Sequence, residues 1–349
     1  MGERLELEHV THLYQGSAGP ALADLSLTVE PGELVAFLGP SGCGKTTALK
    51  AISGLLHPTS GDVRVGGAST LGLPPEHREA AMVFQRALLF PHMSVADNVG
   101  FGLKMRKVPH AEAARRTEEA LRRVRMDGYA DRRPGELSGG QQQRAALARA
   151  LVTDPGLLLM DEPFSSLDAN LREDMRELVK ELQREGGYTT VFVTHDQEEA
   201  VMLADRIALL EGGKLLMYDA PQAFFDRPAS RAVAEFFGGA NFIPGTAENG
   251  HVRTPLGPLR LREPAPPGPV TLTIRPEAVR LSDLGDDENS VAARVVSTTY
   301  LGRQTTCTLE SEGVRLRAAL PPDTPVSEGD DVKALLPAAA LWPLREAHH

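Results

Sequence analysis

The sequence predicts an α/β fold with a doubly wound parallel sheet, followed by a small β-barrel domain. Short apolar runs at 34–38, 156–160 and 191–195 have the length and continuity of parallel strands that are buried on both faces. Long helical patterns alternate with these runs, as a parallel sheet requires. Half of the 26 prolines lie after Ala240, where short strand-like runs replace the helical patterns.

A chain of 349 residues is long enough for two domains, which we expect over residues 1–238 and 239–349. Between about 87 and 154 the pattern becomes mostly helical, which indicates a helical insertion into the first domain. Gly212 and Gly213 separate two apolar runs and predict a tight hairpin at the edge of the sheet.

Composition excludes several classes of protein. The formal net charge of -10 has the wrong sign for a sequence-independent grip on nucleic acid. The two cysteines, Cys43 and Cys307, lie far apart and indicate neither a disulfide framework nor a zinc site. No run of apolar residues is long enough to span a bilayer, and the N-terminus lacks the pattern of a signal peptide. We expect a protein of the reducing cytosol without nucleic acid as a partner.

The segment GPSGCGKT, residues 39–46, matches the phosphate-binding P-loop and stands where one belongs, between a buried strand and a helical stretch. Its glycines allow backbone N–H groups to surround a polyphosphate at a helix N-terminus. Lys45 is expected to reach the β and γ phosphates, Thr46 to ligate Mg²⁺ and Thr47 to donate to the α phosphate. The remaining candidate nucleotide-binding residues of this loop are Gly39, Ser41, Gly42, Cys43 and Gly44, with Cys43 as a small filler rather than a redox switch.

Two carboxylates, Asp161 and Glu162, end the apolar run LLLM, at the end of a strand where α/β folds place their ligand crevices. Asp161 suits Mg²⁺, directly or through water. Glu162 is the candidate catalytic residue that polarises the water attacking the γ phosphate. Without a P-loop in the same chain, such a pair would more often be loop residues or helix caps.

A second glycine-rich turn, LSGGQQQR at 137–144, opens a helix and offers a second set of N–H groups to an anion. With this segment the chain resembles the ATP-binding cassette (ABC) ATPases, whose signature is LSGGQ. The resemblance covers roughly residues 3–237. It implies a homodimer in which Ser138, Gly139, Gly140 and Gln141 of one subunit cover the ATP held by the P-loop of the other. Taken alone, Ser138 is equally explained as a helix N-cap.

The resemblance also assigns the other functional residues of the family, whose motifs occur in the family's order along this chain. It implies that Tyr14 stacks on adenine, although a Tyr at the end of a strand pattern is more often part of a core. Gln85 corresponds to a glutamine that ligands Mg²⁺ and acts in catalysis, and His195 to a histidine that contacts the γ phosphate. Asp168 corresponds to a residue at the dimer contact of the nucleotide site, and it also reads as an N-cap.

Among ABC proteins, one cassette followed by a β domain resembles the importer ATPases. The resemblance implies a peripheral protein at the cytoplasmic face of the membrane that works with permease subunits and, through them, with a solute-binding protein. The segment after Gln85 resembles one that helps to form the permease groove, and the candidates are Leu89, Phe90, Met93 and Val95; each could equally pack the core of the insertion. The segment TIRPEAVRL, residues 273–281, resembles part of the oligosaccharide-binding (OB) type of barrel, which we expect to pair with its twin.

The residues that follow the cassette bear on the identity of the transported substrate. Sugar importers carry a Gly-Ser-Pro-x-Met-Asn motif after the cassette, whereas this chain has FFGGANFIPG at 236–245. This is nearer to the polyamine, ferric iron and inorganic anion branches. The alternatives are a sugar importer, a soluble ABC ATPase acting on nucleic acid or ribosomes, and an exporter subunit. The terminal His348 and His349 are either part of the native tail or an added remnant.

Overall fold

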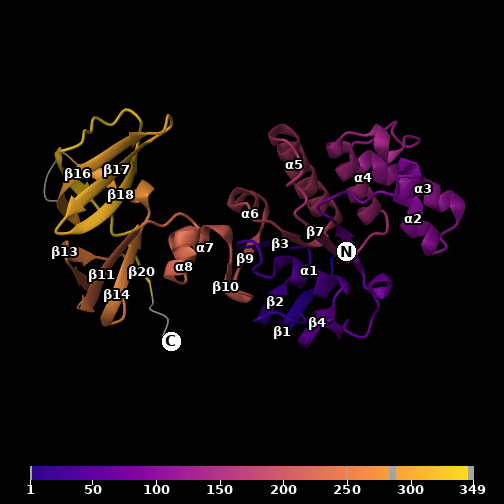
Figure 1. The fold of residues 1–349 in the computed structure, drawn as a ribbon, viewed down its shortest axis with the longest axis horizontal. Helices are drawn as coiled ribbons and strands as arrows, with labels where there is room; N and C mark the ends of the chain where they lie inside the picture. The colour runs from indigo at the N-terminus through magenta and orange to yellow at the C-terminus, as the bar shows by residue number, and fades with distance from the viewer. Residues whose placement is uncertain (1, 249, 283–287, 345–349) are drawn as a thin grey trace. The chain divides into compact units, whose positions relative to one another are not determined.

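The computed structural model describes residues 2–248, 250–282 and 288–344, so the terminal His348 and His349 lie outside the described residues. The chain divides into two compact units, Met1–Pro221 and Gln222–His349 (Figure 1). The sequence placed the boundary at about residue 238, whereas the second unit also takes in the short helices α7 (Pro221–Asp226) and α8 (Arg231–Phe236).

The centre of the first unit is a six-stranded sheet with the strand order β10-β9-β3-β8-β7-β6. All its neighbouring strands pair in parallel except β10, which forms an antiparallel hairpin with β9 through the turn at Gly212 and Gly213, as the sequence predicted. The bounds are β3 (Leu34–Leu38), β6 (Ala80–Val83), β7 (Leu157–Asp161), β8 (Thr189–Val193), β9 (Arg206–Glu211) and β10 (Lys214–Asp219). β3 and β8 are buried along their full length, which explains their continuous apolar or Thr-rich runs.

A second, antiparallel sheet has the order β2-β1-β4-β5 and was not anticipated from the sequence. Its strands are β1 (Leu5–His12), β2 (Leu22–Val29), β4 (Ser60–Val65) and β5 (Ala68–Ser69). Register shifts interrupt the pairing of β1 with both of its neighbours, so the polar–apolar alternation of its first half, Leu5–Glu8, does not continue to its end. Its apolar face joins the core of the central sheet.

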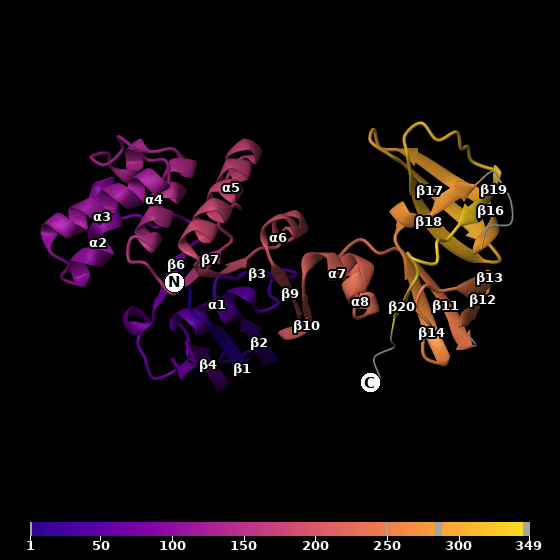
Figure 2. The ribbon, with the colours of Figure 1, turned by 180° about the vertical axis from the view of Figure 1, so that it is seen from behind.

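Helices α2 (Val95–Met105), α3 (His110–Arg123) and α4 (Gly139–Leu151) lie between β6 and β7 in the chain and form the helical insertion. They lie together on one side of the unit in both ribbon views (Figures 1 and 2). The other helices of this unit are α1 (Lys45–Ser53), α5 (Ala169–Gly186) and α6 (Gln197–Leu203), with short 3-10 turns at Pro75–His77 and Pro134–Glu136. No helix among the described residues is long and apolar enough to cross a membrane.

The second unit is built from two five-stranded antiparallel sheets that share one apolar core. One has the order β13-β12-β11-β14-β20, with β11 (Asn241–Glu248), β12 (His251–Thr254), β13 (Gly257–Arg260), β14 (Gly268–Ile274) and β20 (Trp342–Leu344). The other has the order β15-β19-β16-β17-β18, with β15 (Arg280–Ser282), β16 (Ser290–Tyr300), β17 (Thr305–Ser311), β18 (Val314–Leu320) and β19 (Asp331–Leu335). The predicted fold class, an α/β core followed by a small OB-like β domain, is confirmed.

Arg275 explains why α7 and α8 belong to the second unit. It follows β14 and precedes the 3-10 turn Pro276–Ala278. Its guanidinium donates to the carbonyl oxygens of Phe224 (2.9 Å) in α7 and of Phe237 just after α8. Burial lowers the pKa of this guanidinium. The segment that resembled an OB-type barrel therefore ties both short helices to the β-sheets by charge-assisted hydrogen bonds.

Candidate active site

The loop from Gly39 to Gly44 joins the buried strand β3 to the N-terminus of α1. Gly39 and Gly44 have φ values of +148° and +104°, which side chains disfavour. A Cβ at Gly39 would collide with the carbonyl oxygen of Leu210, and one at Gly44 with that of Ala21. The glycines are therefore required by the path of the loop, which brings its backbone N–H groups to a helix N-terminus.

Lys45 folds back over this loop. Its Nζ donates to the carbonyl oxygens of Gly39 (2.7 Å) and Pro40 (2.9 Å), and the side chain is buried. The Cys43 thiol lies 3.8 Å from the same amine, and burial raises its pKa. The thiol is therefore protonated and packed inside the loop, while the ammonium group is fixed at the point where the loop could receive phosphate.

Thr46 in α1 contacts Asp161 in the central sheet. Thr46 Oγ1 donates to Asp161 Oδ1 at 3.1 Å, at the carboxyl end of β7. Burial raises the pKa of the Asp161 carboxyl. One carboxylate and one hydroxyl beside a phosphate-binding loop suit Mg²⁺, which retains waters and binds substrate phosphates rather than a full protein cage. Consistent with such a sparse set, the described residues contain no cluster of three or more metal-binding side chains.

Gln85, Glu162 and His195 converge at the ends of three neighbouring strands. Glu162 Oε1 lies 3.2 Å from His195 Nδ1, and Glu162 Oε2 accepts from Gln85 Nε2 at 3.3 Å. Gln85 Nε2 also donates to Ser165 Oγ at 3.1 Å. Ser165 was not anticipated from the sequence, although it is part of the SSLD segment that supplied Asp168. The structure thus brings the three predicted catalytic residues into one hydrogen-bonded group.

The backbone at Glu162 is held in an unusual conformation. Its φ is +45°, in the left-handed region that glutamate rarely adopts. The N–H of Glu162 donates to the carbonyl oxygen of Val193 at 3.0 Å, and the Ser165 hydroxyl donates to the Glu162 carbonyl oxygen at 3.0 Å. These two bonds fix the turn after β7, so the carboxylate is directed toward Gln85 and His195.

Tyr14 lies near the start of α1. Its hydroxyl is 3.3 Å from Thr47 Oγ1, and its ring packs edge-on against His12, with 4.6 Å between the ring centroids. The Tyr14 side chain is 41% exposed, so it is not the core residue that a Tyr at the end of a strand would more often be. Both ring nitrogens of His12 are buried without a hydrogen-bond partner among the described residues. An exposed ring beside the phosphate-binding helix is placed where a nucleotide base could stack.

The LSGGQ residues do not join this group within the chain. Ser138 and Gln141 form a capping box at the start of α4, with Gln141 N donating to Ser138 Oγ at 3.3 Å and Ser138 N to Gln141 Oε1 at 2.9 Å. Gly139 and Gly140 form the first turn of that helix. Across the described ranges, no hydrogen bond or ion pair joins these four residues to the P-loop. Asp168 caps α5 by accepting from Leu171 N at 3.0 Å.

The apolar candidates after Gln85 separate into two kinds. Val95 is fully buried, so its prediction as a groove residue is wrong: it packs the core of the insertion. Leu89, Phe90 and Met93 are half-buried. Asn98, which the sequence did not single out, is fully buried and fixes this segment through hydrogen bonds of its side-chain amide, including one to the Met93 carbonyl oxygen at 3.4 Å. Its Oδ1 accepts from Phe90 N at 2.7 Å, and its Nδ2 donates to the Phe90 and Ser94 carbonyl oxygens at 3.1 and 2.9 Å.

Two family profiles match the chain. The profile described as "ABC transporter" matches residues 22–165, which include the P-loop, the LSGGQ segment and the pair Asp161–Glu162. The profile described as "TOBE domain" matches residues 272–344, within the second unit.

Related proteins share much of the chain. A protein of Agrobacterium fabrum named Fe(3+) ions import ATP-binding protein FbpC is 45% identical over 298 residues, which are 84% of each chain. A protein of Rubrobacter xylanophilus named spermidine/putrescine import ATP-binding protein PotA is 44% identical over 342 residues, 94% of this chain and 88% of the relative.

A solved structure is similar to part of the chain: the ATP-binding cassette MJ0796, in a dimeric post-hydrolysis state bound to ADP and Pi. It is 33% identical, with a TM-score of 0.56, and the match covers 62% of this chain and 98% of the cassette. That cassette is therefore a dimer that is bound to ADP and Pi.

Proposed function

The chain belongs to the ABC transporter family, as an ATP-hydrolysing subunit with a C-terminal TOBE domain, and we propose that it acts as a homodimer with two Mg-ATP enclosed between its cassettes. The observation that carries the proposal is the position of LSGGQ. Its four residues lie at the start of α4, and among the described residues no hydrogen bond or ion pair joins them to the P-loop of the same chain. They therefore offer an anion-binding turn that the nucleotide site of their own chain does not use. The nucleotide site of a second copy uses this turn.

Within each nucleotide site, every residue has a role that follows from its position. Lys45 and the loop N–H groups hold the β and γ phosphates, and Tyr14 stacks on adenine. Thr46, Asp161 and Gln85 would hold Mg²⁺, which would supply positive charge that stabilises the phosphates during transfer. Glu162 orients the attacking water and accepts its proton, since its carboxylate is fixed by the turn after β7. His195 positions that carboxylate through the 3.2 Å contact and faces the γ phosphate.

Closure of the dimer is the step that completes the site. Ser138, Gly139, Gly140 and Gln141 of one chain cover the γ phosphate bound by the other, and Asp168 contributes to the same contact. Gln85 connects Glu162 with the segment that leads into α2, because it begins the stretch that ends in the half-buried residues Leu89, Phe90 and Met93. We place the permease on that segment, so that nucleotide state and permease position are linked through Gln85.

We propose import as the direction of transport and a cation, ferric iron or a polyamine, as the solute. The support is the naming of two relatives as Fe(3+) and spermidine/putrescine import ATP-binding proteins, together with the segment at 236–245, which lacks the motif of the sugar branch. The chain then works at the cytoplasmic face of the membrane, bound to permease subunits that receive solute from a binding protein.

The test is purification of a tagged chain from detergent-solubilised membranes of its source cell, followed by identification of what accompanies it. The proposal predicts multi-span membrane proteins in stoichiometric amount and ATPase activity in the complex. The same purification from Lys45→Ala cells is the control, because that variant should keep the permease and lose the activity. Recovery of the chain only with ribosomes or nucleic acid would contradict the importer function.

A further inference from the structure

A pocket of about 460 Å³ in the second unit, here named the basic pocket, collects three arginines. It is lined by Arg231, Glu235, Gly239, Ala240, Phe242, Thr308, Arg315 and Arg317. Three guanidinium groups face one carboxylate in this lining, although the chain as a whole carries a formal charge of -10. A local excess of positive charge in an acidic protein attracts anions.

The pocket is built from separate elements that a buried side chain holds together. Asn241, at the start of β11, is fully buried and bonds to the backbone of Arg317 in β18. Its Nδ2 donates to the Arg317 carbonyl oxygen at 2.8 Å, and its Oδ1 accepts from Arg317 N at 2.7 Å. These two hydrogen bonds between the side-chain amide of Asn241 and the backbone of Arg317 fix Arg317 beside Phe242, the residue after Asn241. The arrangement does not depend on the Arg317 side chain.

Two of the three arginines have carboxylate partners that an anion can replace. Arg231 Nε contacts Glu235 at 2.8 Å, and Arg315 Nε contacts Glu310 at 3.2 Å. The side chains of both arginines are more than 60% exposed, at 64% and 72%. Exposed ion pairs of this kind contribute little to the stability of a protein. Their exchange for a more highly charged partner therefore costs little.

Arg317 is the cation without a partner. Within residues 2–248, 250–282 and 288–344, its guanidinium makes no hydrogen bond and no ion pair. Thr308 lies opposite Arg317 in the pairing of β17 with β18, so a hydroxyl and a free guanidinium share one face of the sheet. Arg231 lies over the ring of Phe242, 4.4 Å from its centroid, which keeps that guanidinium plane oriented within the pocket.

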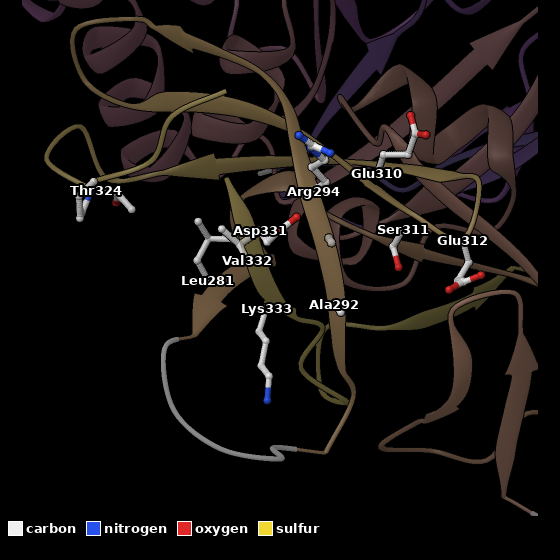
Figure 3. A pocket seen from close by; sticks show the side chains of 12 residues that line it. Leu281, Ala292, Arg294, Glu310, Ser311, Glu312, Thr324, Asp331, Val332 and Lys333 are labelled. Atoms are coloured by element: carbon white, nitrogen blue, oxygen red, sulfur yellow. The ribbon is translucent and has the colours of Figure 1, made fainter. Parts of the chain in front are cut away.

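A second pocket of the same unit serves as a comparison for the charge of the basic pocket. It is lined by Arg294, Lys333, Asp331, Glu310 and Glu312 among others, so acidic residues outnumber basic ones. Figure 3 shows Arg294 beside Glu310, and Arg294 is paired in register with both Glu310 and Asp331. The excess of arginine is therefore particular to the basic pocket, and Arg294 offers a matched control.

We propose that the basic pocket is a binding site for a phosphate-type polyanion, either inorganic polyphosphate or the phosphate group of a nucleotide. Arginine forks bind the paired oxygens of phosphate through two parallel hydrogen bonds. Arg317 supplies the free guanidinium fork, and Arg231 and Arg315 add two further positive charges. The Thr308 hydroxyl donates to a phosphate oxygen between these arginines. This site is separate from the P-loop, and the inference does not depend on the proposed transport function.

The test is calorimetric titration of the full chain with inorganic pyrophosphate. The Lys45→Ala background and a chelator of divalent cations suppress phosphate binding at the P-loop. One pyrophosphate per chain should bind. Arg317→Gln should weaken binding about tenfold or more, the loss expected for a charge-assisted pair. Arg231→Gln and Arg315→Gln should weaken it less, and Arg294→Gln should leave it unchanged.

Trp342 provides a check that each variant is folded. It is the single tryptophan of the chain, and its Nε1 donates to the Pro228 carbonyl oxygen at 3.1 Å within the second unit. Its fluorescence should be the same in all four variants. Absence of pyrophosphate binding, an equal loss in Arg294→Gln and Arg317→Gln, or complete competition by sodium chloride at matched ionic strength would overturn the proposal.

Two further titrations, with orthophosphate and with adenosine 5′-monophosphate, distinguish the sources of the phosphate group. Stronger binding of the nucleotide indicates that Phe242 contacts a base, and equal binding indicates a site for inorganic phosphate species. Either result supports the site, provided that Arg317→Gln weakens both ligands. Failure of Arg317→Gln to weaken either ligand contradicts it.

Discussion

His195 Nδ1 lies 3.2 Å from Glu162 Oε1, so the residues that follow two adjacent parallel strands, β8 and β7, meet at one carboxylate. The second oxygen of that carboxylate accepts from Gln85, which follows β6, the next strand of the sheet. The catalytic group is therefore positioned by three neighbouring strand ends, as expected for a crevice at the carboxyl edge of a parallel sheet.

Glu162→Gln should lower kcat for ATP by a factor of about 10²–10⁴, the range for loss of a general base. The ATP dissociation constant should change little, because Lys45 and the loop bind the phosphates. Single-turnover hydrolysis and equilibrium binding of a fluorescent ATP analogue measure the two effects. Glu76→Gln, at an exposed position, is the control and should keep full activity. A variant of Glu162 with normal turnover would remove this residue from its role.

Ser138→Arg should abolish hydrolysis while each chain still binds ATP, because the altered turn belongs to the neighbouring subunit's site. Arginine also removes the hydroxyl that accepts from Gln141 N in the capping box. Ser138→Thr keeps that cap and is the matched control, with activity expected within a few-fold of wild type. Normal turnover in Ser138→Arg would argue against a site shared by two chains.

Arg78 should stabilise the first unit by fixing the end of the P-loop helix. Its buried guanidinium donates to the Ala51 and Ile52 carbonyl oxygens at 2.8 and 2.9 Å, near the C-terminus of α1. Arg78→Met removes both charge-assisted bonds and leaves the Ile52 carbonyl oxygen without this donor, while the Ala51 oxygen keeps its bond from Gly54 N. The change should lower stability by about 2–4 kcal/mol. Thermal unfolding followed by calorimetry measures this loss. The exposed Arg115→Met should change stability by less than about 1 kcal/mol, and an equal effect of the two changes would contradict the role of Arg78.

Glu199 should make stability depend on pH. Burial raises the pKa of its carboxyl above the ordinary value of 4.5, and Asp196 nearby raises it further, whereas Thr194, Arg176 and Arg172 act in the opposite direction. A raised pKa means that the protonated form stabilises the fold at low pH and that this contribution is lost as pH rises through the folded-state pKa.

Glu199→Gln keeps a hydrogen-bond acceptor for Thr194 Oγ1, which lies 2.6 Å from the present carboxylate. The variant should therefore have a higher melting temperature than the wild type near neutral pH. The difference should shrink as the pH falls to 4.5 and below. Glu198→Gln, exposed on the same helix, should show no such pH dependence. A lower melting temperature for Glu199→Gln at neutral pH would contradict the assignment.

Much of the catalytic group could be predicted because its residues stand directly after buried apolar strands or in turns that require glycine. Asp161 and Glu162 follow four buried residues of β7, and Gly39 and Gly44 have backbone angles that only glycine tolerates well. These signals are local in sequence. The N-terminal sheet was not predicted, although Leu5–Glu8 and Leu25–Val29 alternate between buried and more exposed residues. The bulges in β1 interrupt this pattern only after Leu7.

Residues that act by tertiary contact also escaped prediction. Asn98 and Ser165 are single polar side chains whose importance lies in what they touch: the 90–94 turn in one case and Gln85 in the other. The prediction that Val95 lines the permease groove failed because packing cannot be read from the sequence. An apolar residue at the start of an amphipathic helix can face the core or a partner, and only packing showed that it is fully buried. The arginines of the basic pocket come from α8 and β18, which are distant in sequence; Asn241, at the start of β11, bonds to the backbone of Arg317 in β18.

The central claim is that ATP is enclosed between the P-loop of one chain and the LSGGQ turn of another. It is tested most directly by mixing two chains that each carry Glu162→Gln, one with Ser41→Cys and the other with Ser138→Cys. A short bis-maleimide is then added. The native cysteines, Cys43 and Cys307, are both buried. The account predicts a cross-linked dimer that contains one chain of each kind and forms with Mg-ATP but not without nucleotide. Equal cross-linking without ATP, or none between the two chains with ATP, would contradict it.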